Sequence, residues 1–173
     1  MKIKLRKLEL RDADALAENT NDELIAMNLI GVDFPYRRKD SISWIKDVRK
    51  EYTKKRPESI YFGIDVNGLI VGEVGLYDID YENKNAEIVF WIGKEHRGKG
   101  IVTKAIKEML DYGFEKIKLV RIFATVFTRN KQSVAFLEKL KFEYEGKHKK
   151  VTLKDGKYLD EYTYAKINPK YNK

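Results

Sequence analysis

Alternating apolar and polar residues predict several strands in the first half of the chain. Residues 2–8 alternate in this way and predict a first strand. Residues 59–80 contain two strand-like runs on either side of Asn67-Gly68, a pair that accepts positive φ at a tight hairpin turn. Residues 86–92 follow the polar turn YENKN and predict a third consecutive antiparallel strand. The pattern therefore predicts an antiparallel meander.

Helical patterns lie between these strands. We expect Asp12 to cap a short helix over residues 13–18, and a second short helix over residues 22–28. A longer helix follows the loop GVDFPYRRKD, and either Asp40 or Ser41 is expected to cap it.

The second half of the chain shows the same two kinds of pattern. An amphipathic helix follows residue 100, and Asn130 is expected to cap another helix. The remaining strands are expected at residues 119–127, 142–151 and 157–166, with the last two joined at the turn LKDG. No repeat, linker or low-complexity segment divides the chain, so one domain is expected over residues 1–173.

Composition narrows the class of protein. The chain has no cysteine, which excludes disulfides and cysteine nucleophiles and indicates a reducing compartment, so a cytoplasmic location is expected. The beginning of the chain alternates like a strand and does not resemble a signal peptide. No run of 18 apolar residues is present, so no membrane partner is expected. His96 and His148 are far apart in the sequence, and no metal site is expected.

A net charge of +8 leaves two interpretations open. It indicates either an anionic partner, such as a phosphorylated cofactor or a nucleic acid, or a solubilising surface on which lysines and glutamates are mixed. The basic stretches YRRK, KKR and KHKK support a nucleic-acid- or ribosome-associated module. They are mixed with acidic residues and no RNA-binding motif accompanies them, which makes nucleic acid the less favoured partner.

The segment WIGKEHRGKGIVTKA, residues 91–105, carries the clearest functional signal. A P-loop would need Ser or Thr after Lys99, but Gly100 stands there. A dinucleotide fingerprint would need a third glycine at Thr103 and a βαβ unit, and both are missing. What remains is a strand, a glycine turn and a helix start. The backbone amides of residues 98–102 are then expected to bind a pyrophosphate, assisted by Arg97 and by Lys99.

These residues resemble a known family. The run Arg97, Gly98, Lys99, Gly100, Ile101 and Val102 is similar to the coenzyme-binding motif of the GNAT superfamily of acetyl-CoA-dependent N-acetyltransferases. Four segments in order, which cover nearly the whole chain, resemble its RimJ/RimL-like branch and spermidine acetyltransferases. The resemblance implies a single-domain α+β fold with a mixed, mostly antiparallel sheet flanked by helices. It also implies that this sheet, of about seven strands, is splayed at the coenzyme-binding strand.

The family's chemistry implies roles for further residues. The cosubstrate would be acetyl-CoA, with the backbone of Phe90, Trp91 and Ile92 along its pantetheine arm. Glu87 would be the general base that deprotonates the amine, or else a surface residue. Asn130 would contact the coenzyme, and Ser133 would contact it and act as the acid.

Two positions depart from the family pattern. Val102 replaces a small residue, and Leu137 stands where many members carry a tyrosine. They keep open a third function, a coenzyme-binding sensor that does not catalyse transfer.

The resemblance leaves the amine acceptor undefined. Asp78, Asp80 and Glu82 could form an acidic mouth for a cationic amine or a solvated turn. Four aromatic residues are candidate liners of the acceptor pocket, although ordinary packing explains them equally well. They are Tyr36, Trp44, Tyr77 and Tyr81. A homodimer is common among such relatives and is the further partner to test.

Overall fold

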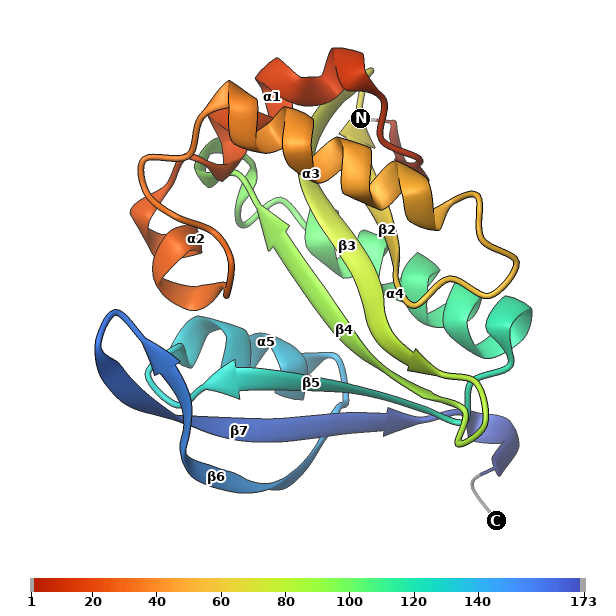
Figure 1. Ribbon diagram of the computed structural model, residues 1–173. Coiled ribbons are helices and arrows are strands. Elements are labelled where there is room, and N and C mark those ends of the chain that lie inside the picture. Colours follow the sequence, from red (N-terminus) through yellow and green to blue (C-terminus); the bar gives the residue numbers. More distant parts are fainter. Residues whose placement is uncertain (1, 172–173) are drawn as a thin grey trace.

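Seven strands form one mixed sheet in the computed structural model, which describes residues 2–171 (Figure 1). The strand order is β1-β2-β3-β4-β5-β7-β6, and only β4 and β5 run parallel. The strands are β1 (Ile3–Arg6), β2 (Ile60–Val66), β3 (Leu69–Asp80), β4 (Asn85–Ile92), β5 (Arg121–Phe127), β6 (Glu143–Lys154) and β7 (Lys157–Ile167). The expected α+β architecture is confirmed.

Five α-helices accompany the sheet. They are α1 (Ala13–Thr20), α2 (Glu23–Asn28), α3 (Arg38–Glu51), α4 (Ile101–Asp111) and α5 (Lys131–Lys139). Short helical turns occupy η1 (Leu10–Asp12), η2 (Lys94–His96), η3 (Tyr112–Ile117) and η4 (Pro169–Tyr171). Along the described chain, no helix is long and apolar enough to cross a membrane.

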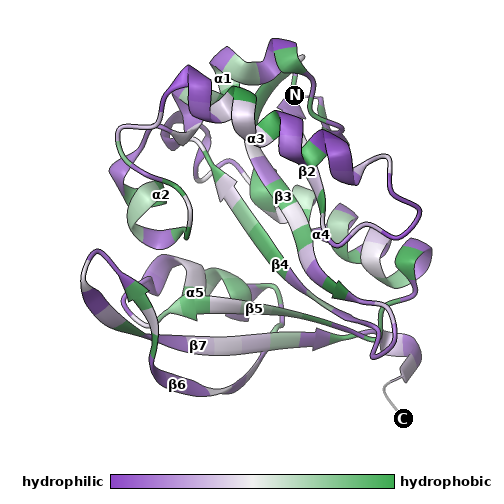
Figure 2. Cartoon of the chain, viewed as in Figure 1, coloured by the Kyte–Doolittle hydropathy of each residue, from purple (hydrophilic) through white to green (hydrophobic). Residues whose placement is uncertain are grey.

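The apolar faces of these helices create two cores on opposite faces of the sheet. The larger core joins α4 and α5 to the strands, with Ile106, Met109 and Leu137 almost fully buried. The smaller core joins α1 and α3 to the other face and includes Leu16 and Ile45. Figure 2 shows the apolar residues concentrated along β3, β4 and α4. Amphipathic periodicity therefore fixes which side of each helix meets the sheet.

The hairpin and the meander follow the sequence pattern. Asn67 and Gly68 both have positive φ in the turn between β2 and β3, as expected for this pair. The antiparallel pairing of β3 with β4 then completes the meander.

The parallel pairing of β4 with β5 is short and opens the sheet. Only residues 85–87 of β4 pair with residues 121–123 of β5. Beyond these pairs the two strands diverge (Figure 1), which leaves the backbone of the second half of β4 without a neighbour on that side. The expected splay is therefore present, and it creates the cleft described below.

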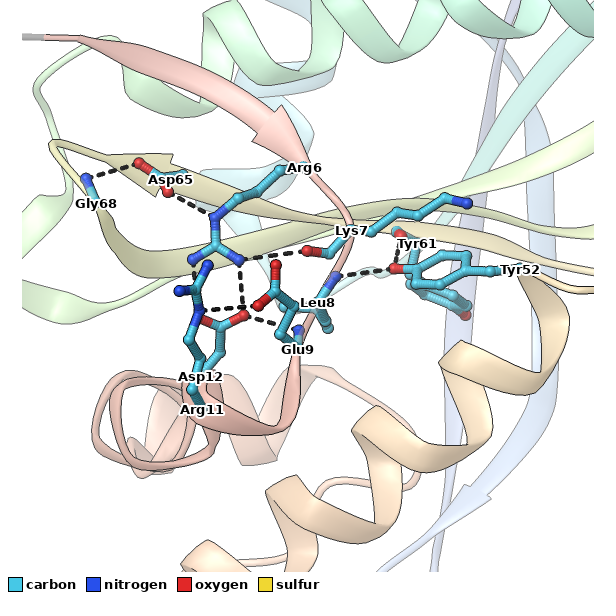
Figure 3. Close-up of polar contacts among 10 residues, drawn as sticks. All are labelled: Arg6, Lys7, Leu8, Glu9, Arg11, Asp12, Tyr52, Tyr61, Asp65 and Gly68. Carbon is cyan, nitrogen blue, oxygen red and sulfur yellow. Dashed lines mark hydrogen bonds and ion pairs between the residues drawn. The ribbon is translucent and has the colours of Figure 1, made fainter.

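Two expected helix caps are wrong. Asp12 precedes α1 but forms no capping hydrogen bond to it. Its carboxylate instead accepts the N–H of Glu9 at 2.8 Å and the guanidinium of Arg6 at 2.7 and 2.8 Å (Figure 3). A partly buried ion pair to Arg6, at the end of the preceding strand β1, thus replaces the expected cap.

The start of α3 also lies earlier than expected. The helix begins at Arg38, so Asp40 sits in its first turn, where its side chain accepts the N–H of Arg37 at 2.8 Å. Ser41 is fully buried within the helix. An acidic residue in the first turn is favourable because it faces free amides.

Candidate active site

The glycine loop presents an open helix N-terminus. Gly98 and Gly100 have φ of 73° and 74°, a region that favours glycine, and nothing lies within 4 Å of a Cβ placed at either position. Within residues 2–171, the amides from Gly98 to Thr103 donate no hydrogen bond. Because α4 starts at Ile101, these amides and the helix dipole suit an anionic group. The residues present therefore fit a diphosphate.

Arg97, beside the glycine loop, also forms an ion pair with Asp22. Its guanidinium donates to the Asp22 carboxylate at 2.7 Å, and Asp22 also caps α2 by accepting the N–H of Leu24. The ion pair therefore ties the glycine loop to α2. Lys99 is exposed beside the open amides.

One cleft gathers the residues that the sequence singled out. It has a volume of about 1210 Å³ and extends from the glycine loop, along the split between β4 and β5, to α3. The expected residues that line it are Glu87, Phe90, Trp91, Ile92, Arg97, Gly98, Lys99, Gly100, Ile101, Val102, Asn130 and Ser133. Their convergence on one cavity comes from the fold, since they span five separate elements and loops.

The side chains of the divergent strand pack on both faces of the sheet. Phe90 and Ile92 pack against the α4 side, and Trp91 packs against the smaller core. Core packing, in place of a contact with the coenzyme, was the interpretation expected for the side chains of these residues. Their backbone remains unpaired toward β5.

Glu87 lies where β4 and β5 separate. Its Oε1 accepts the N–H of Thr125 at 3.0 Å and also the Thr125 hydroxyl. Tyr77 stands opposite Glu87 on β3, and burial together with the Glu87 carboxylate raises the pKa of Tyr77. The glutamate is half-buried and lines the cleft.

Asn130 caps α5, as expected. Its Oδ1 accepts the N–H of Ser133 at 3.2 Å. This bond places the half-buried Ser133 in the first turn of α5 at the cleft wall. Leu137, one turn further, is buried in the core and offers no hydroxyl to the cleft.

The candidate acceptor residues divide into two groups. Tyr36, Trp44, Tyr77 and Asp78 line the cleft. The others do not line it and form a turn instead: Asp80 accepts the amides of Glu82 and Asn83, and the Tyr81 hydroxyl donates to the Pro57 carbonyl.

Sequence reasoning missed Glu73. This residue lies in β3, is only 5% exposed and lines the cleft. Burial raises its pKa to about 7, although the indole N–H groups of Trp44 and Trp91 partly oppose that shift. The sequence contains a signal for Glu73, because it is the one acidic residue within the apolar run LIVGEVGL.

Comparisons with known sequences agree with this geometry. The family model "Acetyltransferase (GNAT) domain" matches residues 2–143. An N-acetyltransferase of Bacillus licheniformis, p20, is 32% identical over 172 residues, which cover 98% of this chain and 95% of p20. The spermidine N(1)-acetyltransferase of Escherichia coli is 28% identical over 144 residues, which cover 83% of this chain and 74% of the relative.

Solved structures show the same fold. The microcin C7 self-immunity acetyltransferase MccE, in complex with acetyl-CoA and AMP, has a TM-score of 0.85 and 28% identity, with 96% of this chain and 93% of MccE covered. Mycobacterium smegmatis RimJ, in complex with CoA-disulfide, has a TM-score of 0.86 and 25% identity, with 99% of this chain and 84% of RimJ covered.

The chain belongs to the GNAT acetyltransferase family and is an N-acetyltransferase of that family. The expected relationship to RimJ/RimL-like and spermidine acetyltransferases is confirmed, and relatives with solved structures hold the expected coenzyme. No cluster of candidate metal ligands occurs among residues 2–171.

Proposed function

We propose that this protein transfers the acetyl group of acetyl-CoA to a primary amine, either a peptide or protein N-terminus or a small amine. The observation that carries the proposal is the open start of α4 at the end of a split sheet. It offers unpaired amides to a diphosphate and an unpaired strand to an extended thioester arm. The whole activity would reside in one domain over residues 1–173.

The coenzyme site would extend along two elements. The amides of residues 98–102 would hold the diphosphate, with added charge from Arg97 and Lys99. The backbone of Phe90, Trp91 and Ile92 would pair with the pantetheine arm, and Asn130 would border it at the start of α5. Acetyl-CoA supplies the acetyl group as an activated thioester.

Two side chains would move the protons. Glu87 would accept the proton of the acceptor ammonium, directly or through water, because its carboxylate lies at the mouth of the split. Ser133 would donate a proton to the departing sulfur; its position in the first turn of α5, among the residues that line the cleft, supports this role. The Thr125 contacts hold Glu87 in position for this task.

An assay that measures the free thiol of CoA released from acetyl-CoA tests the proposal. Acetyl-CoA is offered with N-terminal peptides, polyamines and aminoglycosides, and the acetylated product is identified by mass spectrometry. We expect release of one thiol per acetylated amine with at least one acceptor class. Tight acetyl-CoA binding without any acetylation would instead support the non-catalytic sensor, and steeply salt-dependent RNA binding would support the nucleic-acid module.

Two further expectations stay predictions. A cytoplasmic location was predicted from the cysteine-free sequence, and fractionation of cells checks it. A homodimer was predicted from the resemblance, and light scattering of the purified protein checks it.

A further inference from the structure

Glu73 is a buried carboxylate without a cation. It lies in the middle of β3 and is 5% exposed. Trp44 Nε1 donates to its two oxygens at 2.8 and 3.1 Å, and Trp91 Nε1 donates to Oε2 at 3.2 Å. Among residues 2–171, no lysine or arginine forms an ion pair with it.

Such a carboxylate is costly to bury unless a positive charge compensates it. A carboxylate has about four lone-pair positions, so the three indole contacts leave it able to accept from a further donor. Trp44 and Tyr61, whose ring centroids lie 4.8 Å apart, also line the cleft, and aromatic rings attract cations that approach their faces. The pocket around Glu73 therefore suits an ammonium group.

Charge along the cleft points the same way. Its basic lining residues are His96, Arg97, Lys99 and Lys139, which come from the η2–α4 segment and from α5. The lining that α3 and β3 contribute contains no basic residue and includes Asp40, Asp47 and Asp78 besides Glu73. A cationic substituent entering from the α3 side therefore meets four carboxylates and no basic side chain among the residues that α3 and β3 contribute to the lining.

We propose that Glu73 binds a second ammonium group of the acceptor, distinct from the amine that is acetylated. The inference rests on the proposed function and defines the class of acceptor. Glu73 pairs with Trp91 and Tyr77 pairs with Glu87, so the two glutamates lie on the same face, four positions apart along their strands. At about 3.3 Å per residue, this is roughly 13 Å between their backbones.

The titration of Glu73 gives this binding a pH signature. Burial raises the pKa values of Tyr36, Tyr52 and Tyr61, to about 12 for Tyr36 and Tyr52, and the charge of Glu73 adds to the shift at each of them. These three tyrosines stay neutral near neutral pH. Asp40 and Asp47 of α3 are the acidic residues that α3 contributes to the lining of the cleft. Glu73 becomes charged as the pH rises through about 7, so the attraction for a second ammonium should strengthen there.

A comparison of diamines with monoamines distinguishes binding of the second ammonium group from the acetyl-transfer step. Diaminobutane to diaminodecane are each compared with the n-alkylamine of equal length, and the ratio of their kcat/KM values is measured. We expect the diamine of best-matched length to be preferred by on the order of tenfold or more, beyond the statistical effect of two reactive ends. The preference should grow as the pH rises through about 7. Because the reacting amine is the same, effects on Glu87 or on coenzyme binding cancel in the ratio.

Glu73→Gln should abolish this preference and its pH dependence while the monoamine rate changes little. The matched control is Glu58→Gln, which removes an exposed carboxylate whose side chain is 87% exposed. An unchanged diamine preference in Glu73→Gln would overturn the proposal. Should that variant not fold, a wild-type ratio that shows no diamine preference at any pH would overturn it as well.

Fluorescence gives a readout that does not need catalysis. The chain has two tryptophans, and both donate to Glu73. Adding the diamine alone should change the wild-type emission and leave that of Glu73→Gln unchanged. If no amine is acetylated but this response appears, the proposed function fails and the ammonium site stands.

The second ammonium could belong to a polyamine or to a lysine near a peptide N-terminus. Peptides with lysine or norleucine at the second position distinguish these sources, because norleucine retains the carbon chain without the charge. A lysine preference that Glu73→Gln removes identifies a peptide, and a preference confined to the diamines identifies a small polyamine. No preference in either series refutes the site.

Discussion

At the scale of single residues, two glutamates show how position decides what a carboxylate can do. Glu87 is half-buried and is held by the amide and hydroxyl of Thr125 at the split between strands. Glu73, on the same face of the neighbouring strand, is enclosed by two indoles, and its burial raises its pKa to about 7. These surroundings support the proposed proton transfer by Glu87 and the proposed recognition of charge by Glu73.

Replacing Glu87 tests the first of these assignments. Glu87→Gln should lower kcat by on the order of a hundredfold or more, because the amide cannot accept the proton of the acceptor. Coenzyme affinity, measured by calorimetry, should hardly change, since the proposed diphosphate site follows the other end of β4. A wild-type kcat in this variant would show that Glu87 is not the base and that its role is confined to the contacts with Thr125.

Lys141 carries a backbone conformation that suits glycine. Its φ is 63°, in the left-handed region, directly after α5. Lys141→Gly should raise the free energy of unfolding by about 0.5–1 kcal/mol, because relief of the left-handed strain exceeds the entropy that glycine loses on folding. Urea denaturation measures the difference.

The control for Lys141→Gly is Lys107→Gly, at an exposed position inside α4. Glycine there should lower the free energy of unfolding by about 1 kcal/mol. If both substitutions destabilise equally, strain at Lys141 is not relieved by glycine.

At the scale of elements, the loop between β4 and α4 serves both the fold and the proposed coenzyme site. Its glycines are required by backbone angle, since a Cβ at Gly98 or Gly100 would meet open space. That open space is where a ligand can approach the amides of α4. The loop, its glycines and the helix start are contiguous in the chain, which is why the sequence alone predicts them.

Gly100→Glu should therefore eliminate acetyl-CoA binding, because it adds bulk and negative charge in front of the amides. The matched control is Gly156→Glu, which imposes similar backbone strain at φ 73° in the turn between β6 and β7, outside the cleft. Thermal shift with added acetyl-CoA should be lost only in the first variant. Saturating ligand at about a hundred times its Kd stabilises a protein by about 2.7 kcal/mol, so the loss is easily measured. An equal shift in both variants would contradict the placement of the diphosphate.

At the scale of the whole molecule, an ion-pair cluster remote from the cleft joins distant segments. Arg6 of β1 donates to Asp65 of β2 at 2.6 Å and to Asp12 before α1 (Figure 3). Burial alone would raise the pKa of each carboxyl, but the hydrogen bonds from Arg6 and from backbone amides hold both pKa values below the usual range. These groups therefore contribute stability above the pKa of the unfolded chain, and the contribution is lost as the pH falls through the folded value.

Arg6→Met should lower the free energy of unfolding by about 3–5 kcal/mol at neutral pH, because it leaves two buried carboxylates without their cation. The loss should shrink toward about pH 4 and below, where the carboxyls take up protons. Arg38→Met is the control: it removes the exposed Arg38–Asp14 pair and should cost under about 1 kcal/mol. Equal losses in both variants, or a loss that does not depend on pH, would show that the cluster contributes through packing alone.

The sequence by itself determined the features that neighbouring residues control. The Asn67-Gly68 turn, the Asn130 cap and the open glycine loop all depend on local backbone preferences, and the family motif lies in one contiguous segment. Only the tertiary structure decided the insertion of β7 between β5 and β6, the diversion of Asp12 from its cap to Arg6, and the enclosure of Glu73 between two indoles. The strand order and the contacts of Glu73 depend on segments far apart in the chain. Asp12 is only six residues from Arg6, but the cluster that holds them is completed by Asp65 of β2, 59 residues from Arg6. Such packing and desolvation exist only after the sheet has assembled.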